Sequence, residues 1–176
     1  MNLKDLPIGK NFPDILHAII EIPDGSRNKY EYDVELEIFR LDRVLYSAVH
    51  YPTAYGFIPS TFYEDGDPLD VLVMCSQPLA VGVLLEVRPV GVLRMSDDKG
   101  QDDKILSVAV HDEHYKDVTR VEQLPHHLLV EIEHFFTTYK QLEGKGVKSF
   151  GWEPTEFAKA AIKRSHEEYL KIKNAK

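Results

Sequence analysis

The hydrophobic pattern changes its period once along this chain, and that change is the strongest constraint on the fold. From about residue 15 to residue 110, short runs of β-branched and aromatic residues are separated by clusters of Gly, Pro, Asp and Asn that favour turns. After about residue 124, apolar residues recur at the spacing of one helical face. Strands first and helices last predict an α+β fold that is mainly β.

The predicted strands are Ile15–Ile22, Lys29–Val34, Glu37–Leu45, Val71–Cys75, Leu84–Met95 and Lys104–Val110. Pro89 lies inside one of these runs and indicates an edge or a break there, because proline cannot donate to a neighbouring strand. The later pattern predicts one helix from Leu128 to Leu142, ended by Gly144, and a second helix that begins at Pro154. A small closed or nearly closed β-barrel with helices outside fits this order, and so does an open sandwich with packed helices.

Length and composition bound the class of protein. The 176 residues, 43% of them hydrophobic, suit one domain over 1–176. The formal net charge of -8 disfavours broad contact with nucleic acid or an anionic membrane. The single cysteine, Cys75, allows no intramolecular disulfide. No apolar run has signal-peptide length or approaches the roughly 20 residues of a membrane helix, so we expect a cytoplasmic protein.

Three aspartates, Asp65, Asp67 and Asp70, crowd one turn directly before an apolar strand. Like charges this close raise one another's pKa, so a bound cation would relieve an electrostatic cost. A second acidic run, 97–104, lies between two predicted strands, and the two turns can converge on one ion-binding site. Carboxylate oxygens suit Mg²⁺, Mn²⁺ or Ca²⁺, and we expect magnesium. A solvated acidic loop is the alternative, since Asp and Gly favour turns anyway.

Other motifs are excluded by spacing. A calcium-binding EF-hand begun at Asp65 would need glycine at its sixth position, where Asp70 stands. The eight histidines form no His-Glu-x-x-His pair. Phosphate-binding glycine loops and the Gly-x-Ser-x-Gly nucleophile elbow are also missing from the sequence, and Cys75 in its apolar run is typical of a packed small side chain. Covalent catalysis therefore has no candidate nucleophile.

An acidic site does not bind phosphate by itself, so the chain must also supply cationic or phenolic donors. Arg43 is a favourable candidate, because a guanidinium holds phosphate at two points and this one lies in an otherwise amphipathic strand. Tyr139 lies on the apolar helix face and fits the core as well as a site. The other candidates are Lys29, Tyr51, Tyr55, Lys104 and Lys140.

The run Asp65-Gly66-Asp67-Pro68-Leu69-Asp70-Val71 resembles the signature of the family I soluble inorganic pyrophosphatases. The similarity extends over nearly the whole chain, and the length resembles the prokaryotic branch. The region His111–Thr119 departs from the family, which often carries a proline-containing turn there. Further matching stations are Leu6-Pro7-x-Gly9-Lys10, Glu21-Ile22-Pro23, Tyr51-Pro52-x-x-Tyr55-Gly56, Arg88-Pro89-Val90-Gly91, His134-Phe135-Phe136-x-x-Tyr139-Lys140 and Gly151-Trp152.

The resemblance implies a five-stranded barrel of oligonucleotide-binding (OB) type with flanking α-helices, and a homo-oligomer, commonly a hexamer. It implies that Asp67 receives the proton of an attacking water. The metal ligands implied are Asp65, Asp70, Asp97 and Asp102. The residues implied to hold substrate and leaving phosphates are Lys29, Arg43, Tyr55, Lys104, Tyr139 and Lys140. The accessory positions are Glu21, Glu31 and Tyr51.

The implied function is hydrolysis of inorganic diphosphate to two phosphates by metal-activated water, with several Mg²⁺ ions per site and Mn²⁺ or Zn²⁺ as substitutes. An acidic protein can bind this polyanion only if cations bridge the two, which agrees with the carboxylate clusters. Two alternatives stay open at this point. One is a non-enzymatic OB-type module for single-stranded nucleic acid, and the other is a divalent-ion buffer.

Overall fold

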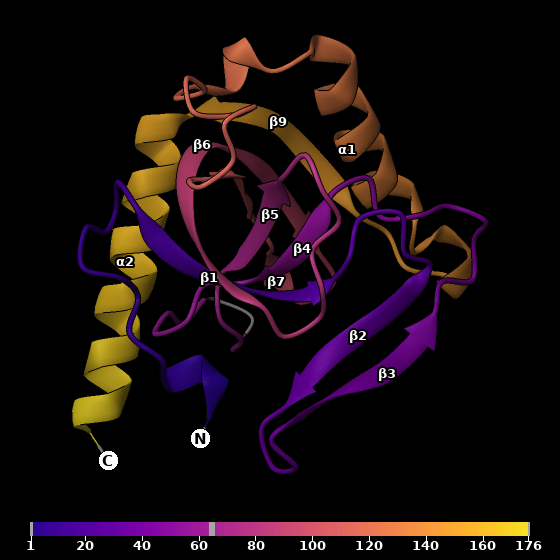
Figure 1. The fold of residues 1–176 in the computed structure, drawn as a ribbon. Coiled ribbons are helices and arrows are strands. Elements are labelled where there is room, and N and C mark those ends of the chain that lie inside the picture. Colours follow the sequence, from indigo (N-terminus) through magenta and orange to yellow (C-terminus); the bar gives the residue numbers. More distant parts are fainter. Residues whose placement is uncertain (1, 64–65, 176) are drawn as a thin grey trace.

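The computed structural model describes residues 2–63 and 66–175. The strands in these ranges are β1 (Leu16–Ile22), β2 (Asn28–Asp33), β3 (Ile38–Val44), β4 (Ala54–Phe57), β5 (Asp70–Met74), β6 (Leu84–Asp97), β7 (Gly100–Gln101), β8 (Lys104–Ala109) and β9 (Lys148–Pro154). The helices are α1 (His126–Thr138) and α2 (Thr155–Asn174), with 3₁₀ turns η1 (Leu3–Asp5), η2 (Val121–Gln123) and η3 (Gln141–Glu143). Figure 1 shows a mainly β fold with both α-helices outside the sheet and the β2–β3 hairpin extending from it.

Five of the described strands close into a ring. β1 pairs with β4, β4 with β5, β5 with β8, β8 with β6, and β6 pairs back with β1. All of these pairings are antiparallel except β5–β8, which is parallel. The mainly β, OB-type fold with flanking helices is confirmed, and the open sandwich is wrong because the first and last strands of the ring are hydrogen-bonded to each other.

Strand β6 closes the ring because it bends. Its first half pairs with β1, while its second half pairs with β9. The edge or break predicted at Pro89 takes the form of an irregularity, because β6 continues through Pro89 while its register against β8 shifts between Pro89 and Gly91. The backbones of β1 and β4 approach each other closely at Gly56 of β4, where a Cβ atom would meet the carbonyl oxygen of Ile19 at 1.9 Å. Only glycine lets β1 and β4 pair at this point.

The strands read as nearly continuous apolar runs because both of their faces are buried. In β5, Val71 packs in a cluster with Ile162 of α2, while its neighbour Leu72 packs in a second cluster with Phe135 and Phe136 of α1. Successive side chains of a strand point to opposite faces, so each helix covers its own side of the β structure. The two faces of these strands thereby belong to two separate apolar clusters, each of which includes one of the α-helices.

The helical prediction needs two corrections. Helix α1 ends at Thr138, not near Leu142, and the η3 turn follows it. Gly144 ends that turn with φ 72°, which favours glycine. Pro154 stands just before the first residue of α2 and not inside its first turn. In the ranges described, no helix has both the length and the apolar character needed to cross a membrane.

Strands β4, β7 and β9 were not predicted from the sequence, and β7 has only two residues. β4 has only four residues, and β9 contains Gly151 and an exposed Phe150, so neither carries a strong alternating pattern. The region His111–Thr119, whose sequence departs from the family pattern, forms turns. Asp112 organises it by accepting hydrogen bonds from the backbone N–H groups of Ser76 (2.6 Å) and His114 (3.0 Å).

Candidate active site

A polar cavity of about 270 Å³ collects side chains from segments far apart in the sequence. Carboxylates and lysines line the same space, together with a few aromatic rings. The residues around it are Lys4, Glu21, Lys29, Glu31, Tyr32, Tyr55, Phe57, Asp67, Pro68, Asp70, Asp97, Lys99, Asp102, Lys104, Tyr139 and Lys140. A cavity of this size suits a small polar ligand better than a nucleotide.

The parallel β5–β8 pair brings the two acidic turns together. Its register sets Asp70 directly opposite Lys104, although 34 residues separate them in the sequence. The tight β6–β7 hairpin, in which Asp97 pairs with Gly100, returns the chain so that Asp102 precedes β8 beside the same space. Asp65 lies outside the described residues. For the others, the expectation that two remote carboxylate turns meet in one place agrees with the fold.

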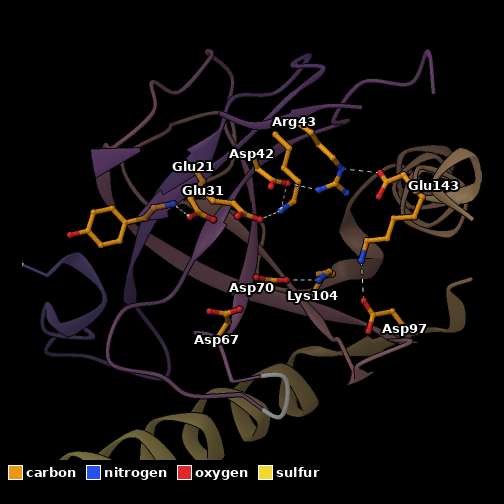
Figure 2. Close-up of polar contacts among 12 residues, drawn as sticks. Glu21, Glu31, Asp42, Arg43, Asp67, Asp70, Asp97, Lys104 and Glu143 are labelled. Atoms are coloured by element: carbon orange, nitrogen blue, oxygen red, sulfur yellow. Dashed lines mark hydrogen bonds and ion pairs between the residues drawn. The ribbon is translucent and has the colours of Figure 1, made fainter. Parts of the chain in front are cut away.

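Lys104 lines the cavity and contacts carboxylates from both acidic turns. Its side chain is only 3% exposed and donates to both Asp70 and Asp102. The rings of Tyr55 and Phe136 each lie 5.8 Å from its Nζ. Burial lowers the pKa of Lys104, but the two carboxylates outweigh burial and raise the pKa above its ordinary value. Lys104 therefore stays charged and neutralises two acids, and Figure 2 shows Asp70 pointing toward it.

Other lysines of the cavity are also paired with carboxylates. Burial raises the pKa of Asp97, but its bond from Lys140 and a backbone N–H outweigh burial and lower the pKa below its ordinary value. The further pairs are Lys140 with Asp97 (2.9 Å), Lys4 with Asp67 (3.0 Å) and Lys29 with Glu31. Opposite charges thus alternate around the cavity.

Two carboxylates of the cavity have raised pKa values. Burial raises the pKa of Glu21 to about 7, even though its Oε1 accepts a hydrogen bond from Tyr32 N at 2.8 Å. Burial also raises the pKa of Asp102 to about 6, and Lys104 offsets only part of the effect. Additional positive charge at this place would stabilise the ionised form of both groups.

The cavity lining contains Asp and Glu but no His or Cys, and carboxylate oxygens are the ligands that hard divalent cations prefer. Among the residues that the structure describes, no three His, Cys, Asp or Glu side chains are arranged closely enough to enclose an ion as they lie. The reason is visible at Lys104, whose ammonium group lies between Asp70 and Asp102. A cation would have to take the place of the lysine at these oxygens.

Two predicted site residues lie apart from the cavity lining. Arg43 pairs with Asp42 and with Glu143, whose Oε1 is 2.9 Å from the arginine Nε. It is connected to the cavity through Asp42, which lies 3.6 Å from Lys29 Nζ. Figure 2 shows Arg43 pointing toward Glu143.

Tyr51 is the other residue that lies outside the lining. It is 2% exposed and belongs to an aromatic cluster, with ring centroids 5.6 Å from Tyr55 and 6.4 Å from Tyr139. Tyr139 itself is 5% exposed and also lines the cavity, so it is both a core residue and a cavity residue. Tyr51 is therefore positioned to support the two phenol groups that reach the cavity.

Sequence reasoning missed Lys4 and Lys99 as cavity residues. Lys4 comes from the N-terminal η1 turn and meets Asp67 across 63 residues of sequence. Lys99 lies in the turn between β6 and β7. Neither lysine belongs to a motif that local spacing could reveal. A comparison of charged residues across relatives would have been the only sequence signal for them.

An OB-type ring of strands with carboxylates and lysines in one small cavity is an arrangement that suits a small polyanion together with cations. A family model described as Inorganic pyrophosphatase matches residues 18–170. The chain belongs to this family, which confirms the resemblance seen in the sequence. The nucleic-acid module and the ion buffer are not favoured.

Inorganic pyrophosphatases of other organisms are similar to this chain over most of its length. An inorganic pyrophosphatase of Thermus thermophilus is 51% identical over 154 residues, which cover 86% of this chain and 88% of the relative. One of Haloferax volcanii is 46% identical over 167 residues, 94% of each chain. The crystal structure of an inorganic pyrophosphatase from Thermus thermophilus matches with a TM-score of 0.94 and 46% identity, over 97% of this chain and 99% of the other.

Proposed function

We propose that this chain hydrolyses inorganic diphosphate to two phosphates in the cavity around Lys104, with Mg²⁺ as its divalent cation. The observation that carries the proposal is the bridge from Lys104 to both Asp70 and Asp102 inside a family member. The bridge gathers in one place the charges needed for a cation and for a phosphate. The cavity's volume of about 270 Å³ supports a small substrate.

The ion pairs of the cavity support a mechanism of partner exchange. Diphosphate is a polyanion, and a chain of net charge -8 would repel it unless cations came with it. On binding, each paired lysine can exchange its carboxylate for a phosphate oxygen, and the carboxylate can exchange its lysine for a cation. No buried charge is then left without a partner at either stage, which avoids the large cost of an unpaired buried ion.

Divalent cations, when bound, would neutralise the phosphates and lower the pKa of a water molecule. The residues proposed to hold them are Asp65, Asp70, Asp97 and Asp102. Those proposed to hold phosphate groups are Lys29, Arg43, Tyr55, Lys104, Tyr139 and Lys140. Glu21, Glu31 and Tyr51 would support them. Arg43 would have to exchange Asp42 and Glu143 for phosphate, because both acids occupy its guanidinium.

Asp67 is proposed to receive the proton of the attacking water. It lines the cavity with its side chain 57% exposed, and water can therefore reach its oxygens. A carboxylate in this position can act as a general base, whose loss usually costs roughly 10²–10⁴-fold in rate. The lysines would stabilise the charge that develops on the departing phosphate.

The proposal is tested by phosphate release from diphosphate, with Mg²⁺ and with EDTA. The wild type should release phosphate only with the cation, and Asp67→Asn should lower turnover by roughly 10²–10⁴-fold without unfolding the protein. Asp14→Asn is the matched control, because Asp14 is an exposed carboxylate paired with a lysine outside the cavity. A wild type that releases no phosphate contradicts the function. Turnover of Asp67→Asn near that of the wild type contradicts the role of Asp67.

Three further statements belong to the same proposal. Mn²⁺ or Zn²⁺ could substitute for Mg²⁺, because each can accept carboxylate oxygens. The presence of one cysteine supports a reducing, cytoplasmic location. The family resemblance supports a homo-oligomer of six chains. No nucleic-acid or membrane partner is proposed.

A further inference from the structure

The N-terminal η1 turn is fixed against three other parts of the molecule. It ends next to Leu6, and its residue Lys4 reaches the cavity. Since the turn is anchored on β2, on the segment after β4 and on α2, the backbone of Lys4 has a defined place. The anchoring hydrogen bonds run from Leu3 N to Tyr32 Oη (3.2 Å), from Ser60 N to Lys4 O (2.8 Å) and from Tyr169 Oη to Asp5 Oδ1 (2.7 Å).

The side chain of Lys4 ends at Asp67. Its Nζ lies 3.0 Å from Asp67 Oδ1, and the two side chains are 27% and 57% exposed. Ion pairs this exposed contribute little to the stability of a fold, because water screens both charges. What the pair does is hold a positive charge at the cavity beside the proposed proton acceptor.

The other cavity pairs show what such a lysine can do. Lys104 and Lys140, both proposed to hold phosphate, are each paired with a carboxylate proposed to hold a cation. Lys4 and Asp67 also form a lysine–carboxylate pair on the lining of the same cavity, with the proposed proton acceptor in the place of a cation ligand. The partner exchange inferred for the other lysines therefore applies to Lys4 too.

We propose that Lys4 is a further substrate-binding residue, whose ammonium group exchanges the Asp67 carboxylate for a phosphate oxygen of diphosphate. The exchange would move the Lys4 ammonium group away from Asp67 Oδ1, the oxygen that it contacts in the structure. Substrate binding and the separation of Lys4 from the proposed proton acceptor are thereby one event. This inference rests on the proposed function, because it assigns a new residue to the same site.

The kinetic test is Lys4→Met, which keeps the length of the side chain and removes its charge. The Michaelis constant for magnesium diphosphate should rise roughly 5–20-fold, the effect of losing a partly exposed charge-assisted hydrogen bond. Turnover should change less than about 3-fold, since binding is the lost function. Lys4→Arg should restore most of the affinity. Lys159→Met is the control, because Lys159 is 35% exposed and pairs with Asp14 at 2.6 Å outside the cavity.

The outcomes separate this inference from the proposed function. A wild type that does not hydrolyse diphosphate overturns the function, and this inference with it. An active wild type with an unchanged Michaelis constant in Lys4→Met overturns the role of Lys4 alone. Thermal unfolding of the variant within a few degrees of wild type shows that the fold is intact. Equal increases in Lys4→Met and Lys159→Met also overturn the proposal, since they indicate a general charge effect.

A second measurement does not depend on turnover. Amine acetylation followed by peptide mass spectrometry reports the accessibility of each lysine. Methylenediphosphonate, a diphosphate analogue that resists hydrolysis, should protect Lys4 severalfold when Mg²⁺ is present, compared with Mg²⁺ alone. Lys159 should be modified to the same extent in both samples. Equal modification of Lys4 in the two samples would overturn the proposal.

Discussion

At the scale of single residues, Glu21 shows how the site stores an electrostatic cost. Burial beside the β2–β3 hairpin, with a smaller contribution from Asp70, raises its pKa to about 7, although the N–H of Tyr32 opposes both effects. The folded protein therefore favours the protonated form of Glu21 more than the unfolded chain does. Its contribution to stability is present at low pH and is lost as the pH rises through the folded value.

The loss of stability with rising pH leads to a prediction for Glu21→Gln. In EDTA, wild-type stability should fall between pH 5 and pH 8 by about 2–3 kcal/mol from this group, because its pKa is about 7 in the fold against an ordinary value of 4.5. Glutamine is neutral and keeps the acceptor for Tyr32 N. Urea unfolding at both pH values should show a smaller loss in the variant. The prediction fails if the two proteins lose stability equally.

At the scale of elements, Asp103 connects the two acidic turns through hydrogen bonds that Tyr63 donates. It is 2% exposed and forms an ion pair with Arg94 of β6 at 2.9 Å. Its Oδ2 accepts a hydrogen bond from Tyr63 Oη at 2.8 Å, and the N–H of Tyr63 donates to Asp67 O at 2.8 Å. One buried carboxylate thus connects the start of β8 with the loop that carries Asp67.

Removing the Asp103 carboxylate should lower the free energy of unfolding more than removing the nearby, exposed Asp98 carboxylate. Asp103→Ala removes the carboxylate that pairs with Arg94 and accepts from the Tyr63 hydroxyl, and it should lower the free energy of unfolding by about 3 kcal/mol. Tyr63→Phe should cost about 1 kcal/mol. Asp98→Ala is the control, because Asp98 is a more exposed acid of the same turn, and it should cost less than about 0.5 kcal/mol. Urea unfolding measures all three. Similar losses for Asp103→Ala and Asp98→Ala would show that the buried connection is unimportant.

At the scale of the whole molecule, the cavity couples ligand binding to the stability of the ring. The proposed cation ligands Asp70, Asp97 and Asp102 come from β5, β6 and the segment just before β8, so a cation held among them would connect strands that are separate in the sequence. The unfolded chain has no such site. Cation and diphosphate should therefore stabilise the folded state by mass action.

This coupling predicts a shift in the melting temperature. Mg²⁺ with methylenediphosphonate, at about 100 times the dissociation constant, should add about 2.7 kcal/mol and raise Tm by roughly 5–10 °C for a chain of this size. Sodium chloride at equal ionic strength should give little change. Asp70→Asn should reduce the shift, because Asp70 is a proposed ligand. A calorimetric scan in which sodium and magnesium act alike would contradict the coupling.

The sequence by itself determined the class of fold, the family and most of the residues around the cavity. Helical and strand periods are local properties, so β1, β5, β8 and the amphipathic α1 could be recognised from neighbouring residues alone. The acidic signature is also local, because it occupies a single turn. Local patterns therefore carried the prediction as far as two separate acidic turns.

Only the tertiary structure decided how those parts meet. The ring is closed by the β1–β6 pair, and the short β4 pairs with β1 through the close contact of Gly56 with Ile19. The periodicity of the sequence indicates neither of these contacts. The cavity includes Lys4 and leaves Arg43 two ion pairs away, because packing and pairing bring together charges that lie far apart in the chain. A charged side chain looks alike in sequence wherever it lies, and only its neighbours in space decide what it can bind.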